Sequence, residues 1–106
     1  MATVKWNKKP LQLWRETLLY GHDEFGETTA IRFVNKTNKV ISKLERFPEI
    51  GFPEPLLKNK KVLYRACHLL PHLKLIYRYY PTSDTVRIVD VWDTRRSPDK
   101  LTKRIR

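Results

Sequence analysis

Glycine and cysteine are scarce in this sequence. With three glycines in 106 residues, it has no Gly-rich loop of the kind that cradles a phosphate in nucleotide-binding proteins. Cys67 is the only cysteine, which excludes an internal disulfide and a cysteine metal cluster and fits a reducing setting. No apolar run approaches the roughly 18 residues of a membrane span, and residues 1–14 lack the apolar core of a signal peptide. We therefore expect a soluble, cytoplasmic protein with no metal and no cofactor.

Positive charge is what the sequence has in excess. Lysine and arginine number 22 against 11 aspartates and glutamates, a net charge of +11, and 41% of the residues are hydrophobic. That hydrophobic share suits one folded domain over residues 1–106. The charge predicts a polyanionic partner, such as nucleic acid, the ribosome or an acidic protein; a solvated basic surface is the alternative. Residues 95–106 form a basic tail with six basic residues and one acidic residue.

The hydrophobic pattern predicts a β-α-α-β-β-β domain of the α+β class. Two segments have apolar residues three and four apart, as helices do, and four resemble strands in their alternation or β-branched content. Short connections should make the helices an antiparallel hairpin, which would lie as a single layer on one face of an antiparallel three-stranded meander. The first strand could join the edge of that meander. The expected strands are 3–7, 62–70, 73–80 and 85–93, and the expected helices run to about residue 24 and from about 28 to 46.

Basic side chains recur on and after the predicted sheet strands. If the helices cover one face, the other face would present its side chains to solvent or to a partner. Such a surface could bind RNA phosphates and stack a base, or receive an acidic or amphipathic peptide; ordinary exposed strand residues are the third interpretation. Asp93 is expected to orient one of the two arginines that follow it, and Glu54, in the Pro-rich loop before the sheet, is expected to be exposed. The candidate binding residues are Arg65, Lys74, Arg78, Tyr80, Arg95, Arg96 and Lys100.

The turn at residues 70–72 decides which of these side chains share a face. A two-residue loop would place Arg65 opposite Ile76, so that Lys74 lies on the same face as Arg65. A three-residue loop would place Arg65 opposite Tyr77 instead. We favour the two-residue loop, because the alternating apolar residues of the strand after it should meet the helices.

Four segments, taken in order, cover nearly the whole chain and carry a resemblance to a known family. They are VKWNKKPLQLW near the start, LERFPEIGFPEPL before the sheet, YRACHLLPHLKLIYRYY in the central strands and VRIVDVWDTRRSPDKL at the last strand. The chain resembles the RelE/ParE superfamily of bacterial type II toxins. The D-T-R-R-x-P pattern in the last segment is the most specific part of the likeness.

The resemblance implies a toxin that inhibits bacterial growth and forms a hetero-oligomer with a cognate antitoxin, which tends to be acidic. RelE-like members cut mRNA in the ribosome; Arg65, Lys74, Arg95 and Arg96 fall near the positions of their catalytic basic residues, which stabilise the transition state. ParE-like members lack that set and inhibit DNA gyrase. Here Cys67 stands where a second central-strand lysine is expected, and no Tyr or His follows Arg96. The long helical hairpin and the D-T-R-R-x-P turn also look closer to the ParE-like branch. That branch is favoured, with a ribosome-dependent mRNA endonuclease as the alternative and a generic nucleic-acid-binding module as a lesser one.

Overall fold

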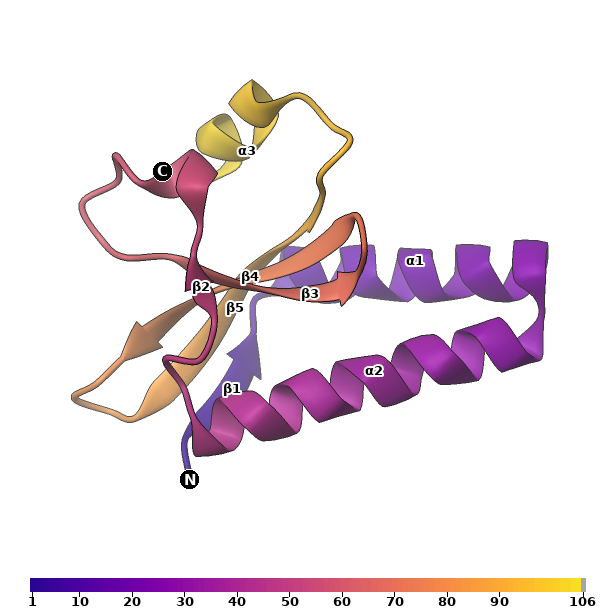
Figure 1. The fold of residues 1–106 in the computed structure, drawn as a ribbon, viewed down its shortest axis with the longest axis horizontal. Coiled ribbons are helices and arrows are strands. Elements are labelled where there is room, and N and C mark those ends of the chain that lie inside the picture. Colours follow the sequence, from indigo (N-terminus) through magenta and orange to yellow (C-terminus); the bar gives the residue numbers. More distant parts are fainter. Residues whose placement is uncertain (106) are drawn as a thin grey trace.

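The computed structural model describes residues 1–105 and has the α+β class predicted from the sequence. Its five-stranded sheet has the order β1-β5-β4-β3-β2, with β1 parallel to β5 and the other neighbours antiparallel (Figure 1). The predicted order of elements is confirmed, whereas β2 and the 3₁₀ helix η1 were not expected. The elements are β1 (Thr3–Trp6), α1 (Lys8–Phe25), α2 (Glu27–Arg46), β2 (Phe52–Pro53), η1 (Pro55–Leu57), β3 (Arg65–Leu70), β4 (Leu73–Tyr80), β5 (Thr85–Asp93) and α3 (Pro98–Arg104).

The two long helices form the expected hairpin. Pro10 lies in the first turn of α1, where its missing N–H costs nothing. Gly26 separates α1 from α2 with a φ of 91°, a conformation that favours glycine. The helices lie side by side along the sheet, joined at the end farthest from the N-terminus (Figure 1). Within residues 1–105 no helix is long and apolar enough to cross a bilayer.

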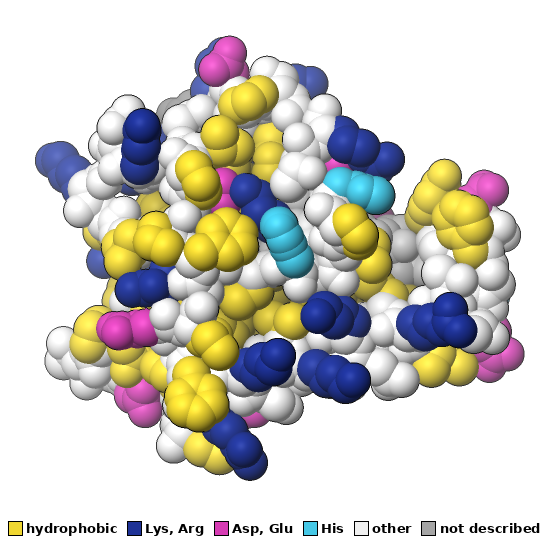
Figure 2. Space-filling model, viewed as in Figure 1, with side chains coloured by type: hydrophobic (Ala, Val, Ile, Leu, Met, Phe, Trp, Pro, Cys, Tyr) yellow, Lys and Arg dark blue, Asp and Glu magenta, His cyan; other side chains and the backbone are white. Residues whose placement is uncertain are grey.

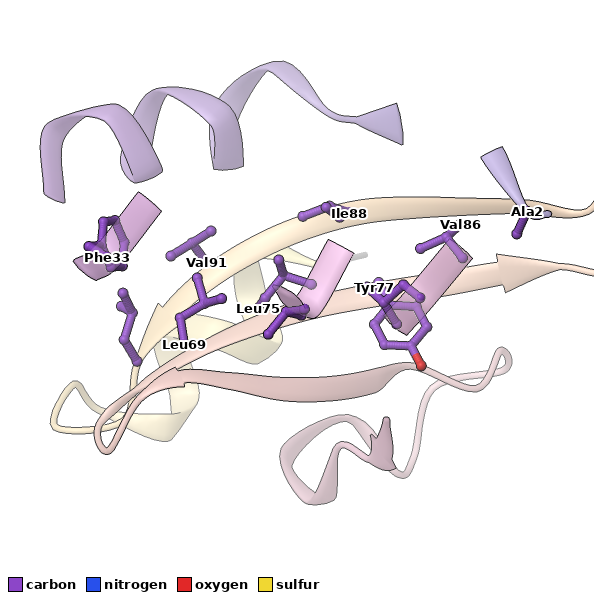
Figure 3. Packing of buried hydrophobic residues seen from close by; sticks show 11 residues of the cluster. Ala2, Phe33, Leu69, Leu75, Tyr77, Val86, Ile88 and Val91 are labelled. Carbon is purple, nitrogen blue, oxygen red and sulfur yellow. The ribbon is translucent and has the colours of Figure 1, made fainter. Parts of the chain in front are cut away.

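The main core lies between this hairpin and the sheet. Phe33, Val40 and Leu44 of α2 pack against buried strand residues such as Leu75 and Ile88 (Figure 3). The indole N–H of Trp14 donates to Thr37 at 2.9 Å, and its ring stacks on Phe33 with 5.6 Å between centroids. The apolar residues of β4, Leu73, Leu75 and Tyr77, belong to this cluster, so their predicted direction is confirmed.

A second, smaller core covers part of the opposite face. Leu57 of η1, together with Leu101 and Ile105 from the basic tail, packs on Ile76 and Trp92 of the sheet. The expectation that this face would be open is therefore wrong at this end of the sheet. The physical reason is the tail itself: Leu101 of the short helix α3 and Ile105, the residue that follows the helix, both pack on the sheet.

The register of β3 against β4 is the one that we did not favour. Arg65 pairs with Tyr77, and a bulge between His68 and Leu70 displaces the ladder. The packing of the apolar β4 residues against the helices could not distinguish the two loop lengths, because these residues face the helices in both registers. Burial on β3 decides instead: Cys67 and Leu69 pack toward the helices, and Arg65 shares their parity.

Candidate functional site

The turn after β5 places Asp93 and Arg95 in a fork-like ion pair. The Arg95 guanidinium donates to both carboxylate oxygens of Asp93, at 3.0 Å and 2.8 Å, and its backbone N–H donates to the same carboxylate at 2.9 Å. These hydrogen bonds lower the pKa of Asp93 to about 2. The prediction that Asp93 orients an arginine is confirmed. We call residues 93–96 the arginine turn; Arg96 is exposed in it, and Lys100 is exposed in α3, further along the chain.

The arginine turn lies at one end of a groove between the helical hairpin and the sheet. The groove has a volume of about 790 Å³. Its floor is apolar, formed by Leu13, Phe33, Leu69, Leu73 and Val91. Its charged lining residues are Arg32, Lys36, Arg95, Arg96 and Arg104, of which Arg95 and Arg104 are paired with aspartates, together with Glu16 and Asp93, so its net charge is positive. Figure 2 shows Lys and Arg side chains along α2 and hydrophobic side chains at the tip of the hairpin, on either side of this hollow. The arrangement suits an amphipathic segment with acidic edges.

Lys74 does not lie in this groove. Its ammonium group donates to both carboxylate oxygens of Glu54, at 2.5 Å and 2.6 Å, and its Nζ sits 5.9 Å from the centre of the Phe52 ring. The Lys74 side chain is 9% exposed and that of Glu54 is 0% exposed. The expectation of an exposed Glu54 is wrong, because β2 pairs with β3 and carries the following glutamate into the sheet beneath η1.

Arg65 lies on the other face from Lys74. Its guanidinium donates to the Gly51 carbonyl at 2.9 Å, and the Gly51 N–H donates to the Tyr77 hydroxyl at 2.9 Å. Burial raises the pKa of Tyr77 to about 12. Arg65 is thus half-buried and hydrogen-bonded to the loop before β2. It pairs with Tyr77 of β4, which lies three residues after Lys74 on the same strand.

Arg78 and Tyr80 form a fourth location, near the β4–β5 hairpin. The Arg78 guanidinium lies 4.4 Å from the centre of the Tyr80 ring, and both side chains are half-buried. The structure therefore distributes the predicted site residues over four places. Arg95 and Arg96 lie in the arginine turn and Lys100 follows in α3, whereas Arg65, Lys74 and the Arg78–Tyr80 pair lie apart from both.

Two acidic residues for which the sequence predicted no partner form ion pairs in the structure. Glu54 neutralises Lys74, and Asp90 is bound by the guanidinium of Arg104 from α3. Burial raises the pKa of Asp90, and the charge of Arg104 partly opposes this. Of these two ion pairs, only the one made by Arg104 had a signal in the local sequence. Arg104 lies in a basic, amphipathic last turn, which favours packing on a strand that carries an acidic residue. Among residues 1–105 no three His, Cys, Asp or Glu side chains come together as a metal site.

Comparison with known families and structures gives a consistent result. The profile of the family described as "ParE toxin of type II toxin-antitoxin system, parDE" matches residues 4–98. No curated protein sequence matches the chain.

Solved structures have the same fold at low sequence identity. The isolated RelE toxin of E. coli has a TM-score of 0.61 at 17% identity, covering 100% of both chains. A YoeB/ParE toxin from Agrobacterium tumefaciens also has a TM-score of 0.61, at 18% identity, covering 86% of this chain and 96% of that one. A heterotetrameric YoeB–YefM toxin–antitoxin complex from Staphylococcus aureus has a TM-score of 0.55 at 16% identity, covering 85% and 93%. With the family profile matched over most of its length, the chain belongs to the ParE toxin family of type II toxin–antitoxin systems.

Proposed function

We propose that this toxin stops growth by binding and inhibiting DNA gyrase, and that a cognate antitoxin neutralises it. One observation carries the choice of a binding mechanism over RNA cleavage. Lys74, a candidate for the phosphate-neutralising residue of a nuclease, is buried against Glu54 with its charge already compensated.

Phosphodiester cleavage by basic residues needs several uncompensated cations around one phosphate, because their task is to stabilise developing negative charge. Here Arg65 and Lys74 point to opposite faces of the sheet. Arg95 is held by Asp93, and of the four residues only Arg96 is exposed without an ion pair among residues 1–105. This geometry disfavours a shared phosphate site.

The groove is the surface that we assign to the antitoxin. An apolar floor with basic residues at its rim favours an acidic amphipathic helix or an extended acidic segment. The structurally similar Staphylococcus aureus toxin is described in a complex with YefM, which supports a protein partner of this type for the present chain. Binding to an acidic partner of this kind would explain part of the excess of basic residues, which gives the chain a net charge of +11.

The second candidate function is ribosome-dependent mRNA cleavage. The fold of the E. coli RelE toxin and the presence of Arg65 on β3 favour it. It would require Lys74 to leave Glu54 when the toxin meets the ribosome, at the cost of separating a buried ion pair.

Induced expression in bacteria separates the two candidates. We expect growth arrest, an intact reporter mRNA in primer extension, and a DNA-damage response. A transcript without a start codon is the control. New 5′ ends that appear only in the translated transcript, and that disappear with Arg65→Ala, would replace the gyrase proposal by the nuclease.

A further inference from the structure

Three basic residues form a row across three neighbouring strands. Lys5 of β1 pairs with Arg87 of β5, and Arg87 pairs with Arg78 of β4. Because adjacent strands lie about 4.8 Å apart, the row spans about 10 Å. The alternation along β1 and β5 sends flanking residues such as Val4 and Val86 into the main core, so the row lies on the opposite face of the sheet.

No acidic partner compensates this row. None of the four ion pairs found among residues 1–105 includes Lys5, Arg78 or Arg87. Arg87 donates to the Asn7 side-chain oxygen at 3.0 Å, and Arg78 lies over an aromatic ring. Each of these contacts orients a guanidinium group without neutralising its positive charge.

The buried carboxylates on this face are already engaged. Glu54 holds Lys74, and Asp90 holds Arg104. Like charges directly opposite each other on neighbouring strands are destabilising. A bound anion would remove that cost for the row.

The row is accessible, and the aromatic ring beside it is that of the half-buried Tyr80, over which Arg78 lies. η1 and α3 cover the part of this face around Ile76 and Trp92, while the β4–β5 hairpin extends away from α3 (Figure 1). Lys5 is exposed and the two arginines are half-buried. None of the three lines the groove.

We propose that the row of Lys5, Arg87 and Arg78 binds the phosphate backbone of a nucleic-acid strand. Guanidinium forks match phosphate oxygens in a two-point geometry, and a linear set of cations matches a linear chain of phosphates. An acidic peptide is less favoured, because peptide partners draw most of their affinity from apolar anchors. The groove has an apolar floor for such anchors, whereas the ring beside the row, that of Tyr80, is half-buried under Arg78. This surface is separate from the groove, so the inference does not rest on the proposed gyrase inhibition.

Fluorescence anisotropy with a labelled DNA single strand of about 20 nucleotides tests the proposal. The triple variant Lys5→Gln, Arg78→Gln, Arg87→Gln should bind at least about tenfold more weakly at about 100 mM salt. Each phosphate contact contributes about 0.7 to the slope of log affinity against log salt, so the slope should become shallower by about 2. Lys5→Gln alone, on an exposed residue whose substitution should leave the fold intact, should weaken binding about threefold.

A matched control removes the same charges elsewhere. The control triple variant replaces one lysine and two arginines that are exposed on the helices, through Arg15→Gln, Lys39→Gln and Arg46→Gln. It should change the affinity less than about threefold. Equal losses in the two triples would mean that only net charge matters and would overturn the proposal, as would unchanged binding in the row triple. Poly-glutamate is a competitor with the same number of negative charges as the DNA strand. If it displaces the DNA, and if the row triple variant loses this competition as well, the row would be assigned to an acidic protein, and the proposal would be overturned.

Discussion

Replacing Glu54 with glutamine should destabilise the fold by about 3–5 kcal/mol, because the Lys74 ammonium would stay buried without its counter-charge. Both side chains are almost fully buried, and Lys74 contacts both oxygens of the carboxylate. The Phe52 ring, 5.9 Å from the ammonium nitrogen, can offset about 1 kcal/mol of this cost at most. For a domain of about 100 residues the loss corresponds to roughly 15–25 °C in Tm.

Urea unfolding, followed by tryptophan fluorescence and circular dichroism, would measure this change. The double variant Glu54→Leu, Lys74→Met should lie within about 1.5 kcal/mol of the parent, since a buried ion pair can be exchanged for apolar residues of similar volume at little cost. Glu49→Gln, at an exposed position of the same loop, is the control and should cost less than about 0.5 kcal/mol.

Two outcomes would refute this description of the pair. One is a cost below about 1 kcal/mol for Glu54→Gln, which is the range of an exposed salt bridge. The other is a double variant no more stable than the single one. Growth inhibition gives a second measurement: because we assign Lys74 no catalytic role, the double variant should remain toxic, whereas a nuclease that depends on Lys74 would lose its toxicity.

Three further substitutions test separate parts of the structure. Asp93→Asn should destabilise the protein by less than about 1 kcal/mol at neutral pH, because the fork to Arg95 is largely exposed. The pKa of Asp93 is lowered to about 2 in the folded protein, so the stability difference from the parent should be complete above the unfolded pKa of about 3.9 and should vanish as the pH falls toward 2. Thermal melts across that pH range measure this difference. Gly51→Ala would place a Cβ 2.7 Å from the Tyr77 ring and hydroxyl, so we expect a loss of about 1–3 kcal/mol in urea unfolding, and a loss below about 0.5 kcal/mol would contradict the close approach. Leu101→Ala, at a fully buried position of α3, should cost about 2–4 kcal/mol in the same assay, and a neutral result would mean that the tail does not pack on the sheet.

Local patterns predicted the helices well. Apolar residues three and four apart predicted a helix from about 28 to 46, and Phe33, Val40 and Leu44, which follow that spacing, are buried on α2. The predicted break between the two helices falls at Gly26. These features depend on residues near one another in the sequence, where periodicity and backbone preference are sufficient. The arginine turn was predicted for the same reason, since Asp93 and Arg95 are two residues apart.

The features that were missed depend on contacts between distant residues. The bulge near His68 shifts the β3 ladder by one position, and apolar alternation on β4 alone gave no means to detect it. Glu54 becomes buried only because β2 pairs with β3, a two-residue strand too short to be identified by its pattern. The row through Lys5 and Arg87 exists only because β1 lies parallel to β5, and those two residues are far apart in the sequence.

The most direct test of the central claim is a DNA supercoiling assay with purified gyrase and the purified toxin. We expect the parent protein to inhibit supercoiling in proportion to its concentration, and the Glu54→Leu, Lys74→Met variant to inhibit equally, because Lys74 is buried in an ion pair away from the groove. Full gyrase activity at every toxin concentration, together with start-codon-dependent cuts in mRNA, would contradict the account and identify the chain as a ribosome-dependent nuclease.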